Sequence, residues 1–337
     1  MTRRTGAIVL GVVVLIGALL VGLLAGPVHI APADAMRWLL SFGRRPSGLS
    51  EQQATILADL RLPRVIVAGI VGAALSASGA AYQAVFRNPL ADPYLLGAAA
   101  GAGLGATLAV TFGPSSAFAF AVPLAAFLGA LAGVGLAYGL GRSGVGGRST
   151  TSLILGGVAV ASFLTAAQTL IQQQRSETLR QVYSWILGRL GTAGWDDVRI
   201  ALPSVAIAVT ILWLCRRLLD VIEVGELEAE SLGLHVARLR LVVVVAASLA
   251  TAAAVSVAGL IGFVGIIIPH GVRLLAGSSY RQVLPLSVLF GASFLILVDV
   301  VARTAVAPAA IPSGVITAFL GAPFFLLALR RSGRRTA

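Results

Sequence analysis

Residues 220–240, DVIEVGELEAESLGLHVARLR, form the one long, strongly charged stretch of the chain, and apolar runs precede and follow it. Arginine pairs bracket the stretch at 216–217 and at 238 and 240. It is too short to be a domain, so we expect a structured loop. Gly225 and Gly233 predict two short helical pieces, with Leu227, Ala229, Leu232 and Leu234 on an apolar side. Two interpretations remain open: a docking surface for a soluble partner, or an ordinary hydrated loop.

The composition predicts an integral membrane protein. Of the 337 residues, 58% are apolar and only 11% are charged, whereas a soluble protein carries roughly 25% charge. All 25 basic residues are arginines, and they stand singly or in pairs between apolar runs, which indicates membrane topology rather than nucleic-acid binding. The single Cys215 excludes an internal disulfide. The three histidines are far apart in sequence, so we expect no metal site.

Ten apolar runs predict ten transmembrane helices. They cover about 6–25, 61–86, 94–112, 117–140, 151–171, 198–214, 239–257, 263–275, 283–301 and 314–329. The first run is too long for a signal peptide, so we expect it to be retained. Residues 33–40 and 172–197 predict amphipathic interfacial segments. Ten spans place both termini on one side, and the arginine bias makes that side the cytoplasm.

No catalytic constellation is visible, so we do not expect an enzyme. A Walker A loop needs a lysine, and the chain contains none, so any ATP hydrolysis belongs to another polypeptide. Asp299, four residues before Arg303, favours a local ion pair over an ion-binding acid. Arg61, Arg64 and Arg303 fall at outer ends of spans, as anchors at the headgroups or as a positive rim for an acidic partner. A cap is the favoured role for His270.

Seven motifs, which extend over nearly the whole chain, resemble the permease subunits of type II ABC importers for iron chelates, haem and cobalamin. They are RLPR (61–64), SGAAYQAVFRNPLADPYLLG (78–97), WILGRLGTAGW (185–195), GELEAESLGL (225–234), IGFVGIIIPHGVRLL (261–275), DVVAR (299–303) and IPSGVITAFLGAPFF (311–325). The resemblance implies an all-α membrane protein with the type II ABC importer permease fold. It also implies one transmembrane permease domain over 1–337, with coupling helices at about 220–237.

The resemblance further implies partners and a cargo. A second copy of the chain, two ATP-binding cassette subunits and an extracytoplasmic binding protein would complete the assembly in a bacterial cytoplasmic (inner) membrane. ATP and magnesium would belong to the ATPase subunits, with no cofactor in this chain. The cargo would be an iron-siderophore, haem or cobalamin, moved by alternating access. An ion-coupled secondary transporter and a structural scaffold are the alternative hypotheses.

Site residues follow from the same resemblance. Coupling to the ATPase is implied for Gly225, Glu226, Glu228, Ala229, Leu232 and Gly233, and docking of the binding protein for Arg61, Arg64 and Arg303. The cytoplasmic gate would comprise Asn88, Leu90, Ser149, Thr150 and Thr151, and the fifth and tenth spans would line the path. Arg189 replaces a residue that is small in many relatives, which favours an anionic cargo.

Overall fold

The computed structural model describes residues 3–41, 48–113, 118–143 and 150–333, and this part of the chain is helical without strands. The first helices are α1 (Arg3–Leu24), α2 (Pro32–Leu40), α3 (Glu51–Thr55), the π-helix η1 (Ile56–Arg61), α4 (Leu62–Phe86) and α5 (Ala98–Phe112). The middle ones are α6 (Phe118–Ser143), α7 (Thr150–Gln174), η3 (Ser176–Thr178), α8 (Leu179–Ile186), η4 (Leu190–Thr192) and α9 (Trp195–Val224). The last are α10 (Glu226–Ser231), α11 (Val236–Ala258), α12 (Val264–Ala276), α13 (Tyr280–Thr304) and α14 (Ser313–Gly333).

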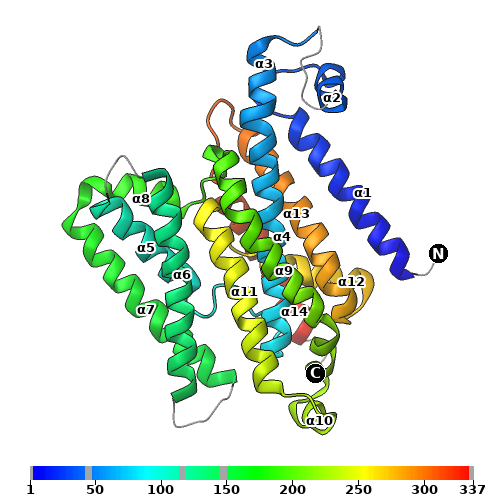
Figure 1. The fold of residues 1–337 in the computed structure, drawn as a ribbon, viewed down its shortest axis with the longest axis vertical. Helices are drawn as coiled ribbons and strands as arrows, with labels where there is room; N and C mark the ends of the chain where they lie inside the picture. Colours follow the sequence, from blue (N-terminus) through cyan, green and yellow to red (C-terminus); the bar gives the residue numbers. More distant parts are fainter. Residues whose placement is uncertain (1–2, 42–47, 114–117, 144–149, 334–337) are drawn as a thin grey trace.

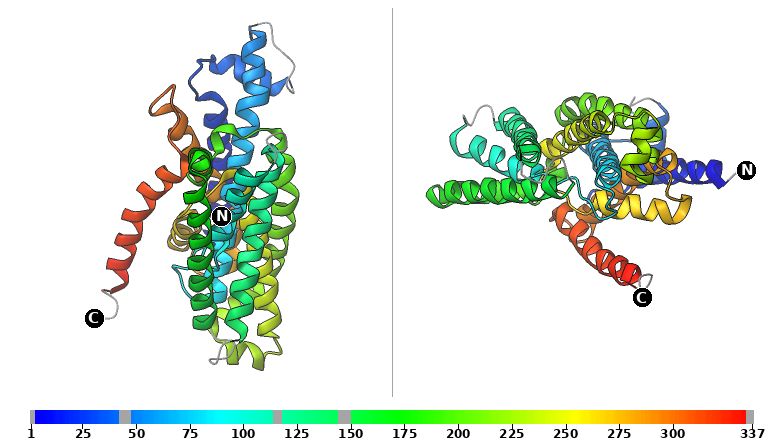
Figure 2. Two further views of the ribbon diagram at one scale, coloured as in Figure 1. Left: turned by 90° about the vertical axis from the view of Figure 1, so that its left-hand side faces the viewer. Right: turned by 90° about the horizontal axis from the view of Figure 1, so that it is seen from below.

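Helix α4 stands at the centre of the bundle, with α2 and α3 at one end of the molecule and α10 at the other (Figure 1). It packs against α9, α11, α12 and α13, while α1 packs against α13. Helices α5, α6 and α7 pack together in a lobe beside this core. Helix α14 leaves the body at an angle and touches mainly α12 and α13 (Figure 2).

Seven helical stretches in the described residues are long and apolar enough to cross a membrane. Shorter apolar helices stand where the third, eighth and tenth spans are predicted: Ala98–Phe112, Val264–Ala276 and Ser313–Leu326. The prediction of an all-α membrane protein is confirmed. Helix α12 has 13 residues, and its length of about 20 Å is less than the roughly 30 Å of a hydrocarbon core.

The second span begins earlier than the sequence indicates. The apolar run predicts a start at Arg61, but helical backbone runs without a break from Glu51 to Phe86, with Pro63 inside it. The π-helix η1 precedes the proline, and the N–H of Leu62 bonds to the carbonyl of Leu57, five residues back. This wider turn accommodates a residue that would otherwise interrupt an α-helix.

The charged stretch contains one short separate helix, not two. Helix α9 continues to Val224, so Asp220 and Glu223 belong to a long helix that we expected to end near 214. The reason is that its apolar face persists: Leu219 and Ile222 are fully buried among the charges. Gly225 and Gly233 flank α10 alone.

Glycine permits the close helix contacts at the centre. A Cβ atom at Gly72 would lie 2.1 Å from the carbonyl oxygen of Gly291 on α13. A Cβ atom at Gly79 would lie 2.1 Å from the carbonyl oxygen of Gly265 on α12. Because hydrocarbon offers no hydrophobic force between helices, such close backbone packing is a main source of association in a membrane.

We predict that Gly79→Val destabilises the protein, because the new side chain pushes α4 away from α12. The expected loss is about 2 kcal/mol or more in the free energy of unfolding, as for overpacked cores. It is measured as a lower thermal unfolding temperature in detergent. Gly17→Val is the matched control, since a Cβ atom there meets nothing within 4 Å. Equal effects of both substitutions would contradict the close-packing argument.

Candidate functional site

Helix α10 presents two leucines to its surroundings at the end of the molecule. Leu227 is 80% exposed and Leu232 is 76% exposed, while Ala229 is fully buried beneath them. The helix ends in a Schellman motif: Leu234 N–H donates to Ala229 O over 3.0 Å, and Gly233 N–H donates to Glu230 O over 2.9 Å. Gly233 has φ +80°, a conformation that glycine adopts without strain.

Ion pairs and hydrogen bonds hold this end of the molecule together. Glu226 on α10 forms an ion pair with Arg240 on α11, whose guanidinium is almost fully buried. Asp220 near the end of α9 accepts hydrogen bonds from the hydroxyl of Ser279 at 2.9 Å and from the backbone N–H of Tyr280. The carboxylate of Asp220 therefore satisfies donors at the start of α13 that the helix itself leaves free.

A second set of polar contacts continues from Tyr280 toward α4. Arg273 on α12 donates to the Tyr280 hydroxyl at 3.0 Å and to Oε1 of Gln83 at 2.6 Å. Nε2 of Gln83 in turn donates to Gly265 O at 3.0 Å and to Ala91 O at 3.4 Å. This polar relay, formed by Asp220, Tyr280, Arg273 and Gln83, connects the end of α9 to the turn after α4.

The turn after α4 contains two of the predicted gate residues. The side-chain oxygen Oδ1 of Asn88 accepts a hydrogen bond from the backbone N–H of Leu90 at 2.9 Å. Asp92 likewise accepts the N–H of Tyr94 at 2.8 Å. Burial raises the pKa of Asp92 to about 6, and the hydrogen bond from Tyr94 opposes that rise. The turn is thus fixed by its own side chains.

The other predicted gate residues lie at the start of α7. Ser149 lies outside the described residues, Thr150 begins the helix, and Thr151 is exposed. The connection between α4 and α5 contacts α7 about two turns after its start. At this contact a Cβ atom at Gly157 would lie only 2.3 Å from Leu95 O. Among the described residues no hydrogen bond joins Asn88 or Leu90 to Thr151, and the gate formed by these residues stays a prediction.

Two of the three predicted docking arginines are buried at the opposite end, contrary to our expectation of headgroup anchors or a rim. Arg61 and Arg303 are each 4% exposed. Arg61 donates to the carbonyls of Leu23 at 3.0 Å and Leu24 at 2.9 Å and also to Val28 O, and Arg303 donates to Gly22 O. Both therefore satisfy carbonyls at the end of α1, where positive charge is favourable.

Asp299 holds the same cluster together. Its carboxylate is 1% exposed and accepts two hydrogen bonds from Nε of Arg64, at 2.9 and 3.0 Å. Arg303 lies farther away, with 3.6 Å between its Nε and Oδ2 of Asp299. The predicted local pair is thus the weaker contact. The principal partner is 235 residues away in sequence, and spacing along one helix carries no signal of it.

A cavity of about 560 Å³ lies between α8 and α14. Leu187, Leu260, Val315, Ala318 and Phe319 are among its lining residues, all of them apolar. Such walls offer a bulky molecule little specific binding. Helix α14, at the predicted tenth span, forms one wall of this cavity, and its role in a path stays a prediction.

Two other residues singled out in the sequence have structural surroundings. Arg189 is mostly buried, with a guanidinium nitrogen 3.8 Å from Oδ1 of Asp197, so an acid offsets part of its charge. His270 lies inside α12 rather than at its end and meets the ring of Phe324 edge-on at 5.4 Å. No cluster of metal-binding side chains occurs among the residues described.

A bundle of long apolar helices, with an apolar cavity beside α14 and the charged helix α10 projecting from one end, is typical of a multi-helix membrane protein. The chain belongs to the FecCD transport family, which matches residues 14–331. It is the permease subunit of an ATP-driven ABC importer and a multi-pass protein of the cytoplasmic membrane.

Similar proteins include named ABC permeases. An uncharacterized ABC transporter permease of Bacillus subtilis is 38% identical, over 98% of this chain and 95% of the relative. A cobalamin import system permease of Halobacterium salinarum is 42% identical over 84% and 75%, and a hemin transport system permease of Yersinia pestis is 38% identical over 83% and 85%. A solved inward-facing metal-chelate type ABC transporter superposes with TM-score 0.83 at 29% identity, covering 95% of this chain and 97% of that one.

We predict that Asp299→Asn is strongly destabilising, because it leaves Arg64 and Arg303 buried without a carboxylate. The expected loss is about 3–5 kcal/mol, as when one partner of a buried ion pair is removed. Thermal unfolding in detergent measures it. The control is Asp196→Asn, in the exposed pair with Arg199, which should cost no more than about 1 kcal/mol. An Asp299→Asn protein as stable as the control would refute the role of this carboxylate.

Proposed function

We propose that this permease imports a metal chelate by alternating access, driven by separate ATPase subunits that grip α10. The observation that carries the proposal is the pair of exposed leucines on a short helix fixed to the fold. Leu227 and Leu232 face outward, while the pair of Glu226 with Arg240 and the Schellman motif hold the helix in place. A small, rigid, partly apolar projection is suited to fit a socket on a soluble partner.

The proposed complex contains two copies of this chain and separate ATPase subunits on the cytoplasmic side. Ten spans, of which three are short helices, put both termini and α10 in the cytoplasm. A second copy of the chain covers the apolar faces of α7 and α14, where Phe163 is 73% exposed and Phe319 is 77% exposed. ATP and magnesium reside on the ATPase subunits, and this chain needs no cofactor of its own.

An extracytoplasmic binding protein docks at the end formed by α2, α3 and η1. Of the three predicted docking arginines, Arg64 has the most exposed side chain, at 15%. It is therefore the one we propose for direct contact with an acidic group of that protein. Arg61 and Arg303 hold α1 in place beside it through carbonyl hydrogen bonds, so their contribution to docking is positional.

Motion reaches the gate through the polar relay in this proposal. Movement of α10 shifts the end of α9, and Asp220 carries the shift to Tyr280, Arg273 and Gln83. Gln83 then acts on the turn that contains Asn88 and Leu90 through its bond to Ala91 O. Such a chain of packed and hydrogen-bonded groups is a physical route for coupling between sites.

The cargo class follows from the cavity and from the relatives. The apolar walls beside α14 suit a bulky complex that a binding protein has already selected. Relatives are named for cobalamin, hemin and iron(3+)-hydroxamate import, so we propose an iron-siderophore, haem or cobalamin as cargo. An ion-coupled secondary transporter is the less favoured alternative, because the buried acid Asp299 is already neutralised by arginines.

We predict that Leu227→Asp/Leu232→Asp abolishes stimulation of the ATPase subunits, because charge enters their apolar contact with α10. ATP hydrolysis by the reconstituted complex should fall to the level of the ATPase subunits alone. Membrane insertion and thermal stability should be unchanged. Leu40→Asp, at a 72% exposed leucine on the opposite end, is the matched control, and hydrolysis is measured without the binding protein that is proposed to dock at that end. Undiminished, gradient-driven uptake by the double variant without any ATPase would instead establish the secondary transporter.

We predict that Tyr280→Phe uncouples hydrolysis from transport, because it removes the hydroxyl that accepts from Arg273. Its backbone bond to Asp220 remains. The expected result is near-normal ATP hydrolysis with several-fold less cargo delivered per ATP, measured in vesicles that contain the whole complex. Tyr183→Phe, at an exposed tyrosine, should leave the ratio unchanged. A normal ratio for Tyr280→Phe would remove the polar relay from the mechanism.

A further inference from the structure

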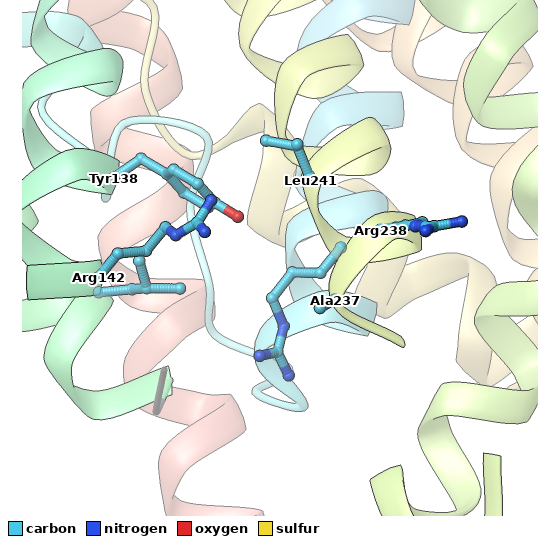
Figure 3. A pocket seen from close by; sticks show the side chains of 7 residues that line it. Tyr138, Arg142, Ala237, Arg238 and Leu241 are labelled. Atoms are coloured by element: carbon cyan, nitrogen blue, oxygen red, sulfur yellow. The ribbon is translucent and has the colours of Figure 1, made fainter. Parts of the chain in front are cut away.

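A second cavity, of about 240 Å³, opens near the α10 end of the molecule between α6, α7 and α11. Its lining includes Tyr138 and Arg142 from α6, Leu153 from α7, and Arg238, Arg240 and Leu241 from α11. Figure 3 shows Tyr138 and Arg142 on one side, with Leu241 and Ala237 facing them across the gap. None of these residues belongs to the cavity beside α14, to the polar relay or to the predicted gate.

The cavity carries more positive than negative charge. Arg240 is paired with Glu226. Arg142 lies 5.7 Å from the ring centroid of Tyr138, and no acidic side chain among the described residues forms an ion pair with Arg142 or Arg238. Arg238 contributes to the lining of the cavity, but its side chain extends from α11 away from Tyr138 and Arg142 (Figure 3), so its charge acts on the cavity from a distance. Arginine with a nearby tyrosine hydroxyl is suited to bind phosphate.

The start of α11 adds a second attraction for an anion. The helix begins at Val236 and has no acidic residue in its first turn, which instead contains Arg238. The first N–H groups of a helix and its dipole favour negative charge, and a basic residue there is unfavourable. An anion at this position would relieve that repulsion.

The neighbouring surface identifies the anion as part of a lipid. On the two helices that carry the arginines, Leu140 on α6 and Val245 on α11 are more than half exposed. The cavity therefore lies where the apolar belt meets the polar end of the molecule. A volume of about 240 Å³ is below the roughly 300 Å³ at which pockets for drug-sized ligands begin. It suits a headgroup, not a metal chelate.

We propose that this cavity binds the phosphate headgroup of an anionic phospholipid from the leaflet on the α10 side. Arg142 and the hydroxyl of Tyr138 hold the phosphate from α6, and the charge of Arg238, whose side chain extends away from them on α11, attracts it at longer range. The acyl chains lie along the exposed side chains of Leu140 and Val245. Basic pockets between transmembrane helices are suited to such headgroups. A lipid held there joins the α5–α7 lobe to α11, directly above the attachment of α10.

The test uses the delipidated full-length chain in neutral detergent and counts bound lipid by native mass spectrometry. The probes are phosphatidylglycerol, phosphatidylcholine and inorganic phosphate. Phosphatidylglycerol should bind at least about tenfold more tightly than phosphatidylcholine. Arg142→Gln/Arg238→Gln should weaken it roughly thirty-fold, since each basic residue near an anionic lipid contributes about a factor of five. Arg37→Gln/Arg199→Gln, at two exposed arginines, should change it less than about twofold.

Several results would overturn the proposal. Equal binding of the two lipids would do so, and so would equal losses of binding in the two double variants. Binding of inorganic phosphate as tight as that of phosphatidylglycerol would mark a site for a free anion. Loss of the lipid on assembly with the ATPase subunits would assign the arginines to a protein partner. If the double variant does not fold, the single variants should each show about a fivefold loss. Because no ATPase or cargo is needed, failure here is distinct from failure of the transport function.

Discussion

The contact that the rest of the structure depends on is the approach of α4 to its neighbours at backbone distance. At Gly72 and Gly79 there is no room for a Cβ atom, because the carbonyls of Gly291 and Gly265 already occupy that space. In hydrocarbon, burial of apolar surface does not drive helices together, so close contact and polar groups between helices must do so. The arginine cluster and the polar relay are both assembled around the two ends of α4.

The sequence predicts the extent of a helix where an apolar run determines it. The prediction is wrong where charged residues hide an apolar face. The runs that became α1, α11 and α13 carry clear signals, and their bounds differ by only a few residues from those expected. The predicted extent of α9 is too short, because the charged residues at 216–223 conceal the apolar face formed by the buried Leu219 and Ile222. The continuation of α4 back to Glu51 was missed, since a proline normally marks a helix start and the sequence does not announce a π-turn.

The site residues show the same division between local and long-range information. The Schellman motif at Gly233 follows from local sequence, and so does the exposed apolar side of α10. The partners of Arg61 and Asp299 do not, because each depends on a segment far away in the chain. Only packing determined that the side chains of Arg61 and Arg303 lie against the end of α1.

Helix α14 touches the body mainly through α12 and α13 and stands apart from it, while its residues line the apolar cavity. A wall attached so lightly can change its tilt without repacking the glycine contacts at the centre. The shape of this cavity is thereby separated from the stability of the scaffold. Substitutions on this single helix can therefore reshape the cavity without disturbing the packing that lets the chain fold.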